Sequence, residues 1–544
     1  MGGGGGESDD SERGRAAGGA SGPNDGDTGG PEEASGPDLI GALAASGVID
    51  PEGATAGDAA TGAEPEEQSV GTSASRGFLW ANVGVFTRYA SALVLAATLA
   101  RSLSTDDYAV MVTLMIVSFY FDNALDLGMG AALVYEQETG ITERVHVAFT
   151  ANVGVTVVLS AVAFFMAPLI ASFYHLQDYT AVFRCFAVVV LLSGLTTIPW
   201  ALFMRNMNFR SRAAVEVSRD MTRFVVTLGL VAGGFGAWAV MIGMIAGYSV
   251  WMVMTWLFIK FRPALRWNLE IVKELFAYAW RMAGTRLLGV LALNGDYIIV
   301  GNQRRDQYPI YYQAFRLPEF VLGAQLNAMS AVLFPMYARI RAEGKVAMRD
   351  ALYKALRLVG LFSIPVGVGL ALVARDGILL MYGSSSTVAI RTMEILSVTG
   401  CVVGLGYATG DLLFAIGRPG VMARINGVMV PVMLGAMWIV ARHGVIWVAT
   451  VHLVTAVVFT LIRQLVVNRI VEAQARSVLA SLVPGVIVSL SVLALALPVR
   501  LSTQPGFASM VLIVLAGGAG GLIGVGISRS ARHEFLDVVA KVRG

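Results

Sequence analysis

Apolar runs of about 20 residues, the length that crosses a bilayer as a helix, recur from Phe78 almost to the end of the chain. Only 14% of the residues are charged, against about 25% in a soluble domain. The chain is therefore expected to be an all-α polytopic membrane protein. Its runs predict about 14 transmembrane helices, at 78–100, 108–128, 146–170, 179–204, 213–233, 236–259, 275–300, 310–334, 351–374, 388–415, 421–441, 445–467, 478–498 and 507–527.

The first 77 residues have a different composition, with 15 acidic residues, 3 basic residues and few apolar side chains. Such a segment buries too little apolar surface to fold alone. We expect 1–77 to be a disordered acidic tail on the cytoplasmic side. The remaining chain carries 37 basic and 23 acidic residues.

Basic residues in the loops predict the orientation, because Lys and Arg accumulate on the cytoplasmic side of short loops. With the tail inside, the cytoplasmic loops hold 23 basic residues and the opposite loops hold 6. This difference predicts an even number of helices with both termini in the cytoplasm.

Reporter fusions at Gly26 and at Gly544 test that orientation, since each reporter is active on one side of the membrane only. We expect both fusions to report the cytoplasm. A C-terminal fusion that reports the opposite side would contradict the fourteen-helix topology.

Arginines inside the spans are the first candidates for function, because a charged side chain in a bilayer costs several kcal/mol unless it faces protein or water. Arg88 lies deep in the first span, with Ser91 on the same arc, and Arg281 and Arg286 lie in the seventh. In the eighth span, one stripe of positions at steps of three and four carries most of the polar side chains: Gln313, Arg316, Phe320, Gly323, Asn327 and Ser330. These spans predict a hydrated, cationic central cavity.

The guanidinium fork suits phosphate or diphosphate. We therefore predict that Arg88, Arg281, Arg286 and Arg316 bind such a group, with Ser91, Gln313 and Asn327 lining the cavity. The charged set Glu216, Arg219, Asp220 and Arg223 near the start of the fifth span is expected instead to pair internally and to orient that helix.

Buried carboxylates are candidates for ion coupling, and Asp296 and Asp411 are the best placed for H⁺ or Na⁺. Two cysteines inside apolar runs and five scattered histidines predict no metal site. Gly344-Lys345 is followed by Val346, so no phosphate-binding loop for ATP is present. Nothing predicts a cofactor or a nucleic-acid partner.

Two segments 200 residues apart, "RSLSTDDY" at 101–108 and "GNQRRDQY" at 301–308, each join two predicted spans. This repeat suggests two six-helix bundles, the kind of duplication that transporters use. The predicted divisions are a first bundle at 78–260, a second at 261–470 that includes an entry segment lying on the membrane surface, and two further helices with a short C-terminus at 471–544.

The order of several motifs resembles the polysaccharide transporter branch of the multidrug/oligosaccharidyl-lipid/polysaccharide superfamily, the O-antigen-type (Wzx) flippases. The motifs are "LARSLSTDDYAVM", "FDNALDLGMGAALVYEQ", "LFMRNMNFRSRA", "GFGAWAV", "GTRLLGVLALNGDYIIVG" and "YYQAFRLPEF". The resemblance implies a V-shaped alternating-access transporter, not an enzyme. It would move a polyprenyl-diphosphate-linked oligosaccharide from the inner to the outer leaflet of a bacterial cytoplasmic membrane. It also implies a cationic cavity, onto which Arg88, Arg286 and Arg316 map, and polysaccharide-assembly proteins as candidate partners.

Four other readings stay open. A lipid II flippase and a cation-coupled drug exporter belong to the same superfamily, and the exporter should have acidic rather than arginine-rich cavity faces. A membrane glycosyltransferase would need a sizeable domain outside the membrane, whereas the predicted outer loops are short. A non-transporting scaffold of a polysaccharide-assembly complex would tolerate loss of the arginines.

Overall fold

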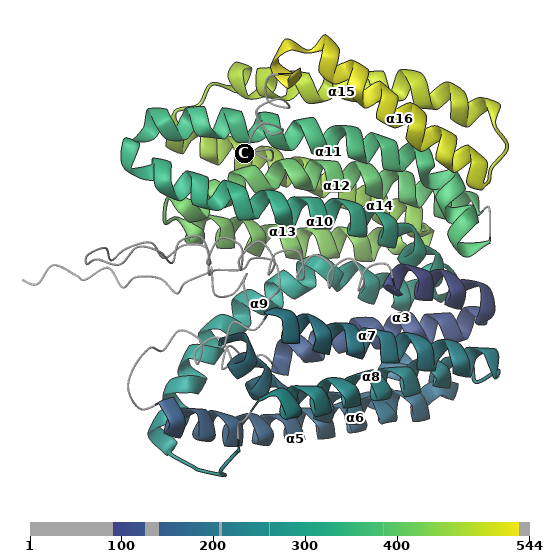
Figure 1. Cartoon of the computed structure of the whole chain (residues 1–544), viewed down its shortest axis with the longest axis vertical. Coiled ribbons are helices and arrows are strands. Elements are labelled where there is room, and N and C mark those ends of the chain that lie inside the picture. Colours follow the sequence, from purple (N-terminus) through teal and green to yellow (C-terminus); the bar gives the residue numbers. More distant parts are fainter. Residues whose placement is uncertain (1–90, 126–140, 206–208, 260–261, 384–385, 533–544) are drawn as a thin grey trace, which may run out of the picture. The chain divides into compact units, whose positions relative to one another are not determined.

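The computed structural model describes residues 91–125, 141–205, 209–259, 262–383 and 386–532 (Figure 1). This part of the chain is helical and holds no strand. After a helix at Ser91–Ser102 come α3 (Thr105–Leu125), α5 (Ile141–Phe173), α6 (Thr180–Arg205), α7 (Phe209–Ala232), α8 (Ala237–Phe258), α9 (Leu269–Gln303), α10 (Tyr308–Ile340), α11 (Lys345–Tyr382), α12 (Thr387–Ala415), α13 (Pro419–Val440), α14 (Val445–Val471), α15 (Ala475–Ser502) and α16 (Phe507–Ile527).

Each predicted span overlaps one of these helices, but several helices are longer than predicted. Helix α11 begins at Lys345 and ends at Tyr382, whereas its apolar run predicts 351–374. Its first turns are amphipathic: Met348 and Leu352 are buried while Lys354 is exposed. The hydrophobic length of a span therefore underestimates its helical length, because amphipathic turns continue the helix beyond the apolar run.

Ten helices of the described part are long and apolar enough to cross a membrane, and the protein is a multi-pass membrane protein. Helices α7, α9 and α10 are long enough but are more polar, since each carries several charged residues. These include α10, on which the polar stripe was predicted.

Neighbouring helices pack in two groups. Helix α5 lies along α6, α7 lies along α8, and α6 also contacts α8; in the other group α10, α11 and α14 surround α12. Helix α15 packs on α11 and on α16, and Figure 1 shows these last two helices, in yellow, beside α11. Helix α9 contacts α3, α5 and α13, so it connects the two groups.

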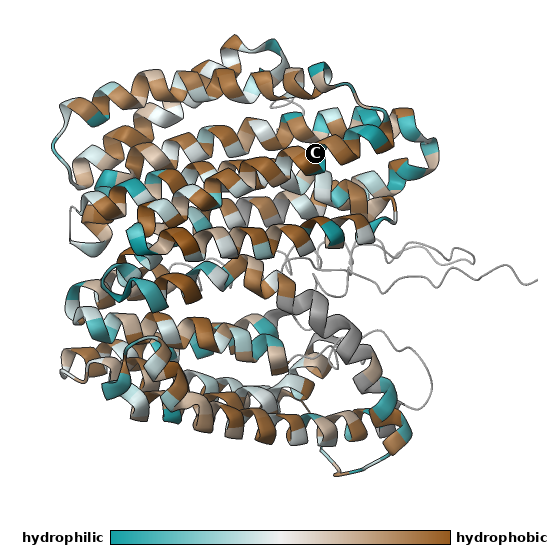
Figure 2. Ribbon diagram, turned by 180° about the vertical axis from the view of Figure 1, so that it is seen from behind, coloured by the Kyte–Doolittle hydropathy of each residue, from teal (hydrophilic) through white to brown (hydrophobic). Residues whose placement is uncertain are grey.

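Exposed apolar side chains mark the faces that meet lipid. Phe165 of α5 and Leu522 of α16 are more than half exposed, whereas most of α3 is buried. Figure 2 shows hydrophobic residues along the lengths of the helices and hydrophilic residues mostly at their ends and in the connections. The apolar outer surface is the one expected of a protein embedded in a bilayer.

Glycines let α15 approach α11 closely. A Cβ atom on Gly485 would lie 2.3 Å from the carbonyl oxygen of Gly360, which is backbone and cannot rotate away. Small residues at helix crossings are the usual means by which membrane helices come together. Helices α11 and α15 can pack this closely because the residue at the crossing is a glycine in both helices, Gly360 and Gly485.

Replacing Gly485 with alanine should therefore force α11 and α15 apart. We expect a lower melting temperature and less folded protein, since overpacking costs about 1–3 kcal/mol. Gly518→Ala in α16 is the matched control, because no atom lies within 4 Å of its added Cβ. Thermal unfolding of the purified proteins, followed by fluorescence-detected size exclusion, compares them. Equal melting temperatures would show that the crossing tolerates a methyl group.

Candidate functional site

Arg316 lies on α10 and is held on two sides. Its Nη1 donates to Oε2 of Glu319 at 2.9 Å, one helical turn further on. Its guanidinium carbon lies 5.2 Å from the centre of the Tyr312 ring, within the range of a cation–π contact. The Arg316 side chain keeps 33% of its surface exposed. A guanidinium that is held but still accessible can bind a further anion.

A second arginine, Arg223 of α7, approaches the same tyrosine. Tyr312 lies within electrostatic range of both Arg316 and Arg223, and Arg223 also lies near Tyr248 of α8. Its Nε and Nη2 atoms are buried and find no hydrogen-bond acceptor among the described residues. Buried donors of this kind are rare in proteins. Tyr312 is therefore within electrostatic range of two guanidiniums that come from different groups of helices.

Close packing of α7 on α8 holds Arg223 in this place. A Cβ atom on Gly247 would lie 3.1 Å from Cβ of Arg223 and 3.1 Å from the carbonyl oxygen of Arg219. Gly243, one turn earlier, faces Thr227. The spacing of these two glycines lets the arginine-bearing face of α7 approach the backbone of α8.

The charged set at the start of α7 pairs only in part. Arg219 Nε contacts Oδ1 of Asp220 at 3.0 Å, and Arg212 Nε contacts Oε1 of Glu216 at 3.4 Å. The first of these ion pairs lies within the predicted set, whereas Glu216 pairs with Arg212, a residue outside it. Within the described residues Arg223 has no such ion pair, and its guanidinium lies within electrostatic range of Tyr248 and Tyr312. The sequence prediction missed Arg223 as a candidate site residue.

Asp122 of α3 anchors a polar network on the N-terminal side of the site. It accepts hydrogen bonds from Ser193 Oγ of α6 at 2.8 Å and from Tyr248 Oη of α8 at 2.9 Å. Tyr312 Oη of α10 donates to Met115 Sδ of α3 at 3.0 Å. These bonds fix α3, α6 and α8 around the two arginines.

Asp296 of α9 is 2% exposed and accepts hydrogen bonds from Tyr311 Oη at 2.7 Å and from the backbone nitrogen of Tyr297 at 2.9 Å. The Tyr297 ring lies 5.9 Å from that of Tyr312. Asp296 also lies within electrostatic range of Glu319, the ion-pair partner of Arg316. The structure brings this predicted coupling residue close to the candidate anion site.

Asp411 of α12 lies elsewhere. Its Oδ1 accepts a hydrogen bond from Ser330 Oγ at 2.8 Å, and its Oδ2 has no partner among the described residues. Ser330 follows Arg316 by 14 residues on the same helix, which is about 21 Å at 1.5 Å per residue. The two predicted coupling carboxylates thus occupy different levels of the membrane.

The structure describes only some of the other predicted site residues. Arg88 lies outside the described residues, and so do the side chains of Arg281 and Arg286 in α9 and of Asn327 in α10. Ser91 and Gln313 are half-buried. The convergence of all four predicted arginines stays a prediction. Within the described residues, no three His, Cys, Asp or Glu side chains are grouped as metal ligands.

The ends of the helices at the loops predicted to face outward are tied together. Arg305 Nη2 contacts Oδ1 of Asp106 at 2.7 Å, and Asn302 Nδ2 donates to the carbonyl oxygen of Phe173 at 2.7 Å. The ring of Tyr174 stacks on that of Tyr308, with 5.9 Å between centres. These contacts join α3 and α5 to the segment between α9 and α10, so this end is closed.

The loop that carries Arg305 also holds an internal ion pair. Arg304 Nη2 donates to Oδ2 of Asp306 at 2.8 Å. This hydrogen bond holds the pKa of the Asp306 carboxyl below its ordinary value. The side chain is therefore ionised at neutral pH and supports the turn that presents Arg305 to Asp106.

Residues 98–391, more than half of the chain, match the family described as polysaccharide biosynthesis protein. The teichuronic acid biosynthesis protein TuaB of Bacillus subtilis is 23% identical over 388 residues, which cover 70% of this chain and 79% of that protein. The lipopolysaccharide biosynthesis protein WzxC of Escherichia coli is 22% identical over 360 residues, which cover 64% of this chain and 71% of that protein.

Two solved structures have a similar fold. The lipid II flippase MurJ in an inward closed conformation superimposes with a TM-score of 0.70 at 14% identity, over 83% of this chain and all but 2% of that one. An inward-facing multidrug resistance transporter of the MATE family gives a TM-score of 0.58 at 16% identity, over 72% of this chain and 100% of that one. At these identities the likeness establishes the fold.

Proposed function

Because the chain belongs to the family of polysaccharide biosynthesis proteins, we propose that it is a flippase for a polyprenyl-diphosphate-linked oligosaccharide, a precursor of a cell-envelope polysaccharide. It moves this lipid from the inner to the outer leaflet of the bacterial cytoplasmic membrane by alternating access. The names of its relatives support this role, since TuaB and WzxC are named for the biosynthesis of envelope polysaccharides. The fold shared with a lipid II flippase supports it as well.

The observation that carries the proposal is the pair of arginines around Tyr312. Arg316 lies over the Tyr312 ring, and Arg223, from the other group of helices, is within electrostatic range of it. A diphosphate offers oxygen atoms to both arginines. Guanidinium groups bind phosphate in a forked geometry that an ammonium cannot reproduce. The polyprenyl chain stays in lipid while the charged diphosphate and the sugars cross along the arginines, which replace part of the lost hydration.

The closed end of the helices indicates the side from which the substrate enters. With Asp106 bound to Arg305 and Phe173 bound to Asn302, the substrate reaches Arg316 from the opposite side, which the loop charges predict to be cytoplasmic. Opening must then break these outer contacts. Asp296, close to Arg316 and bonded to Tyr311, is the better placed residue for coupling to H⁺ or Na⁺.

The drug-exporter alternative fits the site less well. Its fold is shared, but a cationic drug would meet the two arginines, Arg223 and Arg316, beside Tyr312. A lipid II flippase would share both the fold and the diphosphate chemistry. The two functions therefore differ only in the sugar part of the lipid that is transported.

Depletion of the protein in its host tests the proposed substrate. We expect mass spectrometry of the lipid extract to show accumulation of a complete polyprenyl-diphosphate oligosaccharide. Accumulation of lipid II would favour the alternative flippase. An unchanged lipid-linked pool together with loss of surface polysaccharide would favour a scaffold in an assembly complex.

A further inference from the structure

Within the described residues, three tyrosine hydroxyl groups at the closed end of the helices are buried and have no hydrogen-bond partner. Tyr108 lies in the first turn of α3, Tyr308 is the first residue of α10, and Tyr382 is the last residue of α11. None of the three is more than 5% exposed. Gln313 lies near Tyr108 and Thr113 lies near Tyr308, but neither is placed for a hydrogen bond to these oxygens. Buried polar atoms without partners are few in native proteins, so three of them at one end of the molecule need an explanation.

These tyrosines meet around Tyr312, where the two groups of helices touch. The ring of Tyr108 on α3 lies edge-on to that of Tyr312 on α10, with 6.2 Å between centres. Tyr308 and Tyr382 lie within electrostatic range of Tyr312, and Tyr174, which follows α5, stacks on Tyr308. Helix α3 also contacts α6 and α8 of the first group. Separation of the two groups at this end would therefore uncover the three hydroxyl groups.

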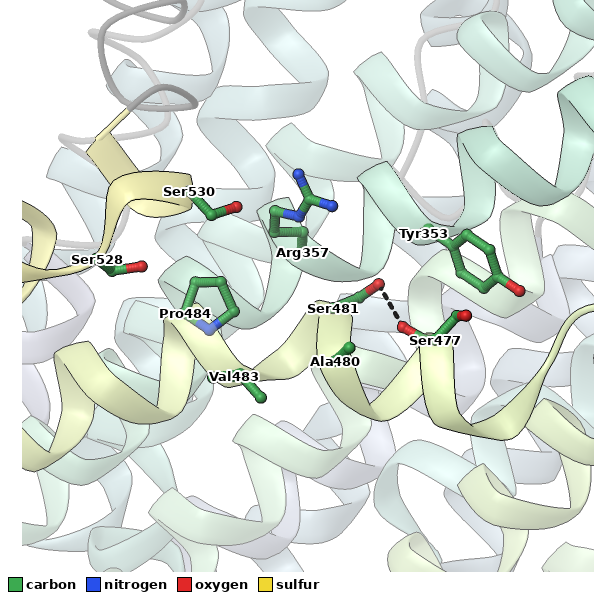
Figure 3. Close-up of a pocket in the computed structure, with 9 residues that line it drawn as sticks. All are labelled: Tyr353, Arg357, Ser477, Ala480, Ser481, Val483, Pro484, Ser528 and Ser530. Atoms are coloured by element: carbon green, nitrogen blue, oxygen red, sulfur yellow. Dashed lines mark hydrogen bonds between the residues drawn. The ribbon is translucent and has the colours of Figure 1, made fainter.

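Hydroxyl groups at the opposite end of α11 are bonded instead. A pocket of about 370 Å³ lies between the first turns of α11 and the first turns of α15 (Figure 3). In its lining, Tyr353 Oη accepts from the backbone nitrogen of Gln474 at 2.9 Å, and Ser481 Oγ donates to the carbonyl oxygen of Ser477 at 2.8 Å. Of the two tyrosines of α11, it is Tyr382, at the closed end, whose hydroxyl has no partner among the described residues.

An unpartnered hydroxyl group makes the closed end less stable. In the closed state its oxygen has left water without gaining a protein partner, which costs free energy. In an open state water supplies the missing hydrogen bonds, so the cost is removed. A phenylalanine at the same position would have the opposite preference, since its ring gains by burial and has no hydroxyl to satisfy.

We propose that the hydroxyl groups of Tyr108, Tyr308 and Tyr382 promote opening of the closed end, by offsetting part of the stability that the packed aromatic rings give it. This inference rests on the proposed function, because alternating access requires this end to open once in each cycle. The three tyrosines are positioning residues for that step, and their role requires no contact with the substrate.

Thiol accessibility in the purified full-length protein measures the opening. Thr113 of α3 is buried beside Tyr308, so a cysteine at this position should react with a small methanethiosulfonate only when the end opens. The reporter is Thr113→Cys in a chain from which Cys185 and Cys401 have been removed. Ser172→Cys, at an exposed position near the end of α5, reports the rate of unhindered reaction.

We expect Tyr108→Phe, Tyr308→Phe and Tyr382→Phe each to slow modification at position 113 at least about fivefold, because each removes the cost of one unpartnered buried hydroxyl from the closed state. Modification at position 172 should not change. If one variant does not fold, the other two decide the result.

Tyr337→Phe is the matched control. Tyr337 is also buried with an unpartnered hydroxyl among the described residues, but it lies in the last turn of α10, away from the closed end. Its substitution should leave modification at position 113 unchanged. An equal slowing in this variant would overturn the proposal, since the effect would then come from loss of any buried hydroxyl.

Unchanged or faster modification in the three variants would also overturn the proposal. Slower transport together with an unchanged rate of modification would overturn it in favour of hydroxyl groups that bind the substrate. The thiol assay needs no substrate. Equal rates at position 113 would therefore contradict this inference alone, whereas a wild-type protein that opens but moves no lipid would contradict the proposed function alone.

Discussion

Replacing Arg316 with glutamate should abolish translocation of the lipid-linked glycan while folded protein still accumulates. The substitution removes a guanidinium and sets a carboxylate beside Glu319 and the incoming diphosphate. We expect the rate to fall by a factor of at least about 30, since losing one partner of a desolvated, hydrogen-bonded charge pair costs about 2–5 kcal/mol. Arg316→Lys should be intermediate, because it keeps the charge but loses the fork. The measurement is the transport rate per folded protein in proteoliposomes.

Arg339→Glu is the matched control for this experiment. It makes the same change of charge on α10, but Arg339 lies exposed in the last turn of that helix. We expect near wild-type transport from it. Arg223→Gln should also lower the rate, since Arg223 approaches the same Tyr312 ring. Wild-type transport in well-folded Arg316→Glu protein would place the diphosphate elsewhere, and failure of that variant to fold would assign Arg316 a structural role.

Cross-linking the closed outer end should stop transport completely. The Asp106–Arg305 ion pair joins α3 to the loop before α10, with the two side chains 50% and 35% exposed. A pair this exposed contributes only about 0–1 kcal/mol, so Asp106→Asn alone should change the rate little. Cysteines at both positions, joined by a short thiol cross-linker after removal of Cys185 and Cys401, would keep this end closed. Transport should then cease and return when the link is cleaved.

A second cysteine pair controls for the effect of cross-linking itself. Lys345 and Glu472 are also in contact, at 2.7 Å, but they belong to α11 and to the end of α14, which pack within one group of helices. Linking them should leave transport largely intact. Full activity with the 106–305 link in place would contradict alternating access through this end.

The helices could be predicted from the sequence because apolar runs are local. Each predicted span overlaps a helix of the described residues, ten of which are long and apolar enough to cross a membrane. The differences lie at the helix ends, where amphipathic turns such as those after Lys345 continue the helix. Part of the site could be predicted in the same way, because the polar residues of α10 recur with the period of a helix and this pattern includes Arg316. Asp296 was identified as a buried carboxylate, but its closeness to Arg316 required the packing of α9 on α10.

Arg223 shows what the sequence could not supply. Its neighbours Arg219 and Asp220 make it look like one member of a local ion-pair set. Tyr312, within its electrostatic range, lies in another helix almost 90 residues later in the chain. The repeat at 101–108 and 301–308 suggested a duplication only. In the structure these two segments also meet, through Asp106 and Arg305. Both findings depend on contacts distant in sequence, which no local pattern encodes.

Translocation by the purified protein tests the central claim most directly. Proteoliposomes would be loaded with the lipid-linked oligosaccharide recovered from depleted cells, and its appearance in the opposite leaflet followed with an impermeant glycosidase. We predict that the protein moves this lipid faster than protein-free vesicles do, and that Arg316→Glu protein does not. Rates equal to those of protein-free vesicles, in preparations where the protein is folded, would contradict the assignment of this chain as a flippase.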